Sequence, residues 1–181
     1  MRFFACPLPY RLLAVVLILL STGIQAQQSA LVQKELHKLV QKGTLNAEDI
    51  SEYVITSQHT SRTSGVHHIY YRQQIDGIQI YGAEASVHTS AQGKLIAAHN
   101  KFIPDVRARM SGSRSPQLNV VQALQKAAQH LGMGSASARI ITTNTDTQRT
   151  TTLEAPAIAR SVIPAKLMYH FDEKMGARPM S

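Results

Sequence analysis

The sequence contains a single cysteine, Cys6, and no tryptophan. Arg2 and Arg11 lie on either side of Cys6 and precede an apolar run from Leu12 to Leu20. An apolar run of about 7 to 15 residues behind a basic start is typical of a secretory signal peptide, and it is shorter than the about 20 residues of a transmembrane helix. We therefore expect signal cleavage after Ala26, which would leave a chain without cysteine.

The expected export has two consequences. Without cysteine the exported chain cannot form disulfide bonds, so its stability must come from packing, hydrogen bonding or association with a larger partner. We expect it to be secreted or periplasmic and to have no membrane contact once the signal is removed. The alternatives for the apolar run are an uncleaved amphipathic anchor or a buried helix, and its length favours the signal.

The sequence also lacks the motifs of common hydrolases. No histidine is followed by glutamate, so the His-Glu-x-x-His motif of zinc peptidases is absent. There is no Gly-x-Ser-x-Gly nucleophile elbow, and no thiol after Ala26. We therefore expect a protein that is not an enzyme, with no catalytic residues and no cofactor.

The eight histidines include no pair spaced i, i+4. His67 and His68 are adjacent on an expected strand, where neighbouring side chains point to opposite faces. A cross-strand approach of His68, His88 and His99 is the one arrangement that could ligate a metal. Without a cysteine or a convergent carboxylate we expect no metal site, and we interpret these residues as surface or half-buried strand histidines.

The formal net charge is +8, and two of the arginines lie in the expected signal peptide. Arg107, Arg109 and Arg114 are the only clustered basic residues after it. They lie in a connector, Val106–Ser115, that contains serine and glycine, and we interpret this connector as a solvated linker. Scattered positive charge of this kind predicts no nucleic-acid partner.

The apolar residues of the first unit follow a helical period and then a strand period. Val32, Leu36, Leu39 and Val40 form the stripe of an amphipathic helix, which Gly43 can end. Beyond it we predict a four-stranded antiparallel meander whose apolar face the helix covers, which is an α+β fold. The predicted strands are Glu52–His59, Val66–Ile75, Ile78–Thr89 and Lys94–Ile103.

Turn residues support the meander. Asp76-Gly77 between β-prone segments predicts a hairpin with a type I′ turn, which needs positive φ at both central residues. Gly93 suits the left-handed position of a longer hairpin loop. On the third strand we expect one face to be buried; its members would be Tyr81, Ala83, Ala85 and Val87.

A second unit is expected after the connector. Asn119 with Gln122 is arranged like a capping box in front of an apolar helical stripe, and Gly132 follows that stripe. Ala138–Thr143 and Lys166–Phe171 are predicted strands, and the Thr-rich stretch between them is either a loop or a strand. We expect no strand in the polar tail from Asp172 onward, so the sheet of this unit would end early with an unpaired edge.

Several of these stretches resemble a known family. Glu52–Thr56, the hairpin Tyr70–Tyr81 and the residues that follow it are similar to the fungalysin/thermolysin propeptide domain of bacterial fungalysin-type zinc metallopeptidases. Gln79 stands where the family usually has proline. The residues that match the family motif, all in structural roles, are Gln73, Gln74, Gly77, Ile78, His88 and Gly93.

The later part resembles the neighbouring region of the same precursors. Ser115-Pro116 with the following helix, and Ile163–Tyr169, are similar to the start of a PepSY-like domain. The domain boundaries expected from this resemblance are a signal peptide at 1–26, a propeptide domain at 27–105, a linker at 106–115 and a partial PepSY-like domain at 116–181.

The resemblance implies a pro-region that assists the folding of a zinc peptidase and inhibits it until maturation. Its partner would be the peptidase catalytic domain, which lies in the same chain in relatives and is absent from this sequence. We therefore expect a truncated fragment without peptidase activity. The alternative is a free-standing exported module that binds a protein or peptide through a sheet edge or exposed face.

Overall fold

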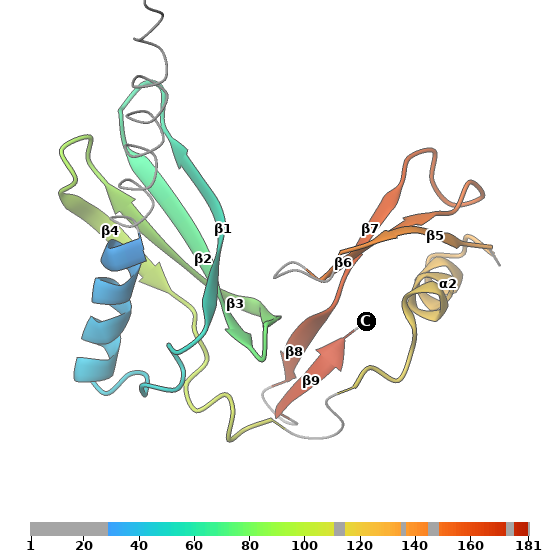
Figure 1. Cartoon of the computed structure of the whole chain (residues 1–181), viewed down its shortest axis with the longest axis horizontal. Coiled ribbons are helices and arrows are strands. Elements are labelled where there is room, and N and C mark those ends of the chain that lie inside the picture. The colour runs from blue at the N-terminus through green and yellow to red at the C-terminus, as the bar shows by residue number, and fades with distance from the viewer. Residues whose placement is uncertain (1–28, 111–114, 135–136, 145–148, 173–175, 181) are drawn as a thin grey trace, which may run out of the picture.

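The computed structural model describes residues 29–110, 115–134, 137–144, 149–172 and 176–180, so the expected signal peptide and its cleavage position, Ala26, lie outside the described residues (Figure 1). The protein is mixed α+β, as expected. Residues 29–41 are helical. The other elements are β1 Tyr53–Thr60, β2 His67–Ile75, β3 Ile78–Thr89, β4 Leu95–Asn100, α2 Val120–His130, β5 Arg139–Thr143, β6 Thr150–Glu154, β7 Ile163–Lys166, β8 Met168–Asp172 and β9 Gly176–Met180.

The first sheet begins with four strands that follow each other in the chain. β1 pairs with β2, β2 with β3 and β3 with β4, each antiparallel to its neighbour. The β2–β3 turn has φ of 51° at Asp76 and 72° at Gly77, so both central residues are left-handed as the type I′ prediction requires. Gly93 has φ of 78° in the β3–β4 loop, which confirms the left-handed position predicted there.

Strand β3 has different neighbours along its length. Its second half, from Ala85, pairs with β4, while Gln79, Ile80 and Tyr81 pair in parallel with β8. Between these halves Gly82 adopts φ of 81°, a conformation that an L side chain rarely adopts. The backbone of β3 is therefore irregular at the point where its neighbour changes from β4 to β8.

Because of the irregularity at Gly82, the buried face predicted for β3 was partly wrong. From Arg72↔Glu84 to Gln74↔Gln79, β2 advances two residues and β3 advances five. This bulge breaks the two-residue alternation of side chains. Ala83, Ala85 and Val87 are buried as predicted, but Tyr81 is 58% exposed and does not belong to the buried face.

The main apolar core lies between the helical segment 29–41 and the first sheet. Val32 and Leu36 are 0% and 1% exposed, and they belong to one cluster with residues of β2, β3 and the segment after β4. Figure 1 shows the segment, in blue, beside these strands. The other buried members of the cluster are Leu45, Ile69, Tyr71, Ala85, Val87 and Phe102.

A second buried cluster joins the later strands to the first sheet. Tyr169 of β8 is 1% exposed and packs with Ile80 and Val106. Strand β9 pairs antiparallel with β8. Two expectations were therefore wrong: the strand near Lys166–Phe171 joins the first sheet rather than a second one, and the tail after Asp172 does supply a strand. Both errors concern pairings between residues far apart in the sequence.

The remaining strands form a separate three-stranded sheet in the order β5-β6-β7. Strand β6 shows that the Thr-rich stretch contains a strand. The capping box at the start of α2 is confirmed, because the Asn119 side chain accepts from the Gln122 N–H and the Gln122 side chain accepts from the Asn119 N–H. Gly132, with φ of 70°, follows the end of the helix.

We predict that truncating Leu36 to alanine destabilises the first sheet strongly. The side chain is 1% exposed, and a buried Leu→Ala change usually costs about 2–5 kcal/mol through lost contacts and a residual cavity. Leu131→Ala is the matched control, because Leu131 is 71% exposed and its loss should cost less than about 0.5 kcal/mol. Urea unfolding of both variants followed by circular dichroism measures the difference, and equal midpoints would contradict the packing of 29–41 on the sheet.

Candidate functional site

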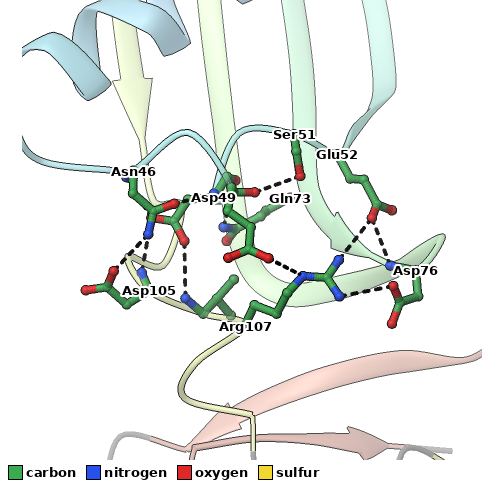
Figure 2. Close-up of polar contacts among 10 residues, drawn as sticks. Asn46, Asp49, Ser51, Glu52, Gln73, Asp76, Asp105 and Arg107 are labelled. Atoms are coloured by element: carbon green, nitrogen blue, oxygen red, sulfur yellow. Dashed lines mark hydrogen bonds and ion pairs between the residues drawn. The ribbon is translucent and has the colours of Figure 1, made fainter.

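The motif residues of the sequence analysis lie at both ends of the first sheet. Gln73, Gln74, Gly77 and Ile78 are in or beside the β2–β3 hairpin turn, whereas His88 and Gly93 are near the far end of β3. The structure therefore does not bring all six together. The hairpin end carries a connected set of polar side chains, and it is the first candidate site (Figure 2).

Gln73 is the buried centre of this set, with 0% of its surface exposed. Its side-chain amide donates to the carbonyl oxygens of Asp49 and Ile103, both at 3.1 Å. Its own amide oxygen accepts from the Ile103 N–H at 2.9 Å. A buried amide with all these bonds satisfied ties β2 to the segments before β1 and after β4.

Asp49 is the second buried polar residue of this set, 3% exposed, and it was not predicted as a site residue from the sequence. Its carboxylate accepts three backbone N–H bonds, from Asn46 at 2.9 Å, Asp105 at 3.1 Å and Val106 at 3.2 Å. The Asn46 side chain in turn accepts from the Asp49 N–H at 2.9 Å. The carboxylate thus satisfies backbone donors from both flanks of the sheet.

Glu52 extends the set to the hairpin turn. Its two carboxylate oxygens accept from the backbone N–H groups of Asp76, at 3.2 Å, and Gly77, at 3.0 Å. Asp76 and Gly77 are the two residues of this turn with positive φ. The carboxylate therefore stabilises the turn by accepting from both of its central amides, and Figure 2 shows its contact with Asp76.

Arg107 joins the acidic side chains of this end. Its guanidinium contacts Glu48 at 3.0 Å, Glu52 at 3.3 Å and Asp76 at 3.2 Å. The interpretation of 106–115 as a solvated linker was wrong for its first residues, because Arg107 is ion-paired and Val106 is 3% exposed. A planar guanidinium with several donors suits such multiple pairing.

The other motif residues of the hairpin are mainly structural. Ile78 is 6% exposed in the second apolar cluster. Gln74 lies opposite Gln79, whose amide oxygen accepts from Arg72 at 3.0 Å. The buried amide oxygen of Gln74 and amide nitrogen of Gln79 have no hydrogen-bond partner among the described residues.

At the far end of the sheet, His88 contacts a second histidine. Its Nδ1 lies 2.8 Å from Nδ1 of His68, and its Nε2 lies 3.1 Å from the Ser86 hydroxyl. Burial lowers the pKa of His88 from its ordinary value of 6.5, and the nearby histidines lower it further. Gly93, in the loop beyond, has no described atom within 4 Å of the point where a Cβ would lie, so only its positive φ favours glycine.

The chemistry of both ends is that of structural and binding groups. Among the described residues no group of three or more His, Cys, Asp or Glu side chains is placed to hold a metal. A small cavity of about 180 Å³ lies elsewhere, beside the start of α2, with Arg149 and Lys166 in its wall. In the described part of the chain no helix is long and apolar enough to cross a bilayer.

Comparison with known proteins finds a family motif over β1 to β4. A family model, the Fungalysin/Thermolysin Propeptide Motif, matches residues 51–102, which include β1 to β4. Bacillolysin from Brevibacillus brevis is 28% identical over 82 residues, which are 45% of this chain and 15% of bacillolysin. The chain thus matches a small part of that relative's length. The family model that matches this chain is a propeptide motif, which is a non-catalytic element.

We predict that Asp49→Ala destabilises the protein by about 2–4 kcal/mol, because three backbone N–H groups lose their acceptor and buried unsatisfied donors are costly. Asp49→Asn keeps one accepting oxygen and should lose less. The control is Glu154→Ala, whose ion pair with Arg139 is exposed and should be worth no more than about 1 kcal/mol. Urea unfolding of the three variants gives the ranking, and an Asp49→Ala midpoint equal to that of Glu154→Ala would show that the carboxylate is not needed.

Proposed function

We propose that this chain is the pro-region of an exported zinc metallopeptidase precursor of the fungalysin/thermolysin type, and that it acts as a folding chaperone and inhibitor of the peptidase domain. The observation that carries the proposal is the match of the propeptide motif to residues 51–102, a stretch that forms one hydrogen-bonded set of strands. The partner would be a peptidase catalytic domain, in the same chain in relatives and in trans for this chain.

The geometry of the sheet supports this role. A pro-region needs a surface of fixed shape rather than a reactive group, since it acts by complementarity to another protein. The buried hydrogen bonds of Gln73 and Asp49 hold the two flanks of the sheet to its hairpin end. They would keep an inhibitory surface rigid before the partner binds, which lowers the entropy cost of association.

The finer organisation is part of the same proposal. A signal peptide is removed after Ala26, residues 27–105 form the propeptide domain with the helix at 29–41 on its meander, and residues 116–181 are a partial PepSY-like unit. In favour of the last assignment, α2 and the sheet β5-β6-β7 both lie in that range. Export to the periplasm or the medium follows from the signal.

One observation favours a second candidate, a free-standing exported module that binds a protein or peptide. Strand β5 is at the edge of its sheet and is exposed along its whole length. It carries Ile140 and Ile141, which are 48% and 46% exposed. An exposed edge strand with apolar side chains can accept an extended peptide as an additional strand.

We predict that the purified chain, from residue 27 onward, slows a thermolysin-type zinc peptidase at micromolar concentration. Bacillolysin is the first test enzyme, because this chain is similar to part of it. The rate of peptide hydrolysis is measured against increasing chain concentration. Leu131→Ala should inhibit as the parent does, whereas Leu36→Ala should inhibit less, because its loss destabilises the first sheet.

The same material separates the two candidates. When the chain is used as bait in the secreted fraction of the producing cell, capture of a metallopeptidase supports the pro-region, and capture of an unrelated protein or peptide supports the binding module. An unchanged peptidase rate at large molar excess, for bacillolysin and for any captured peptidase, would count against inhibition.

A further inference from the structure

Four histidines lie side by side on one face of the first sheet, one from each of its first four strands. His59 of β1 is directly opposite His68 of β2, and His68 is directly opposite His88 of β3. His99 of β4 is opposite Ser86 of β3. Ser86 lies two residues before His88 and therefore on the same face of the strand. A cross-strand approach of His68, His88 and His99 was conceivable from the sequence, and in the structure His59 joins them.

The four rings are close enough to influence each other's charge. The ring centroids of His59 and His68 are 4.8 Å apart and stacked, and those of His68 and His88 are also 4.8 Å apart. The centroids of His88 and His99 are 6.2 Å apart. Unit charges about 5 Å apart in water repel each other enough to change an equilibrium constant by a few-fold, and more where water is partly excluded.

Hydrogen bonding limits the protons that this cluster accepts. The 2.8 Å contact between Nδ1 of His68 and Nδ1 of His88 can hold one proton, because one nitrogen must accept. The Nε2 of His88 faces the Ser86 hydroxyl, which can accept when that nitrogen is protonated. The pair can therefore carry one positive charge, but a second would place two N–H groups against each other.

The residues around the four histidines supply little negative charge to offset positive charge on the cluster. On the same face the next positions along β2, β3 and after β4 are Arg72, Glu84 and Lys101, and Arg72 already pairs with Glu84. Tyr70 lies between the histidines and Arg72, and its ring is against those of His59 and His88. The connections at this end of the sheet carry Arg62 and Lys94, which are basic. The helix 29–41 packs on the other face.

We propose that these four histidines make the β1–β4 sheet a pH-sensitive unit, stable at neutral pH and destabilised as mildly acidic solution protonates them. The proposal concerns the stability of the fold itself and does not depend on the proposed function. If the chain is also a pro-region, acidification would loosen its hold on the peptidase, an effect that rests on the proposed function.

The sign of the effect follows from His88. Its pKa in the folded protein is lowered, first by burial and then by the charges of His68, His99 and His59. The unfolded chain, with an ordinary value of 6.5, binds more protons than the folded chain just below that pH. The stabilising contribution is therefore fully present above pH 6.5 and is lost as the pH falls through the lower folded value.

The test is urea unfolding of the full chain at pH 7.5, 6.5 and 5.5, followed by circular dichroism in the presence of EDTA so that no bound metal contributes. This range lies above the ordinary titration of carboxylates. We expect the unfolding constant of the parent to rise by about tenfold between pH 7.5 and 5.5, as repulsion among several neighbouring charges requires. His88→Gln should flatten this dependence, and so should the double variant His59→Gln/His99→Gln.

The double variant keeps the test decisive if His88→Gln does not fold, because both of its positions are exposed. The matched control is His37→Gln/His130→Gln, which removes two exposed histidines outside the cluster and should leave the pH dependence as in the parent. The proposal is overturned if the parent shows no rise in the unfolding constant, or if the control flattens the dependence as much as the cluster variants. Both outcomes are measured without any peptidase, so they are separate from a failure of the proposed function.

Discussion

The fold depends on one buried carboxylate and the amide beside it. Asp49 accepts three backbone N–H bonds from segments that precede and follow the sheet, and Gln73 bonds to the backbone at two further points of the same segments. Loss of these hydrogen bonds would be costly in free energy, because both residues are almost completely buried and water could not readily replace the lost partners. Together they fix where the chain enters and leaves the meander, so the positions of the helix, the hairpin and the start of the second half all follow from them.

Local chemistry was predicted well from the sequence because its partners are close in the chain. The Asp76-Gly77 turn and the Asn119 capping box each depend on a few adjacent residues, and both are present as predicted. The errors were all long-range. Pairing of β8 with β3 joins residues such as Ile80 and Tyr169, and no periodicity in either segment indicates the other as its neighbour. Exposure of Tyr81 depends on that same change of partner, since Gly82 interrupts the strand there.

For the candidate site, too, the sequence indicated some residues but not their distant partners. Resemblance to a family selected Gln73 and Gly77. Their partners were missed: the Asp49 backbone carbonyl accepts from Gln73, and the Glu52 carboxylate accepts from Gly77. An acidic residue in a polar stretch usually indicates solvent exposure. Arg107 was assigned to a linker for the same reason. A signal was available: a short segment with Asn46, Asp49 and Glu52 in front of the first strand supplies acceptors that a hairpin turn and a chain returning from the last strand both need. The family match covers β1 to β4 of this sheet and leaves the second half of the chain, including β8 and β9, to be assigned by its own contacts.

The shared strand β3 has a consequence for the order of assembly. Its second half is satisfied by β4, which follows directly in the chain, whereas its first half waits for β8, which comes much later in the sequence. During synthesis, the early meander can therefore form while one stretch of its backbone is still an open template. The arrival of β8 then closes that template in parallel orientation. The first half of the molecule thus forms the surface onto which the second half docks. Docking of β8 therefore indicates that this surface has already formed.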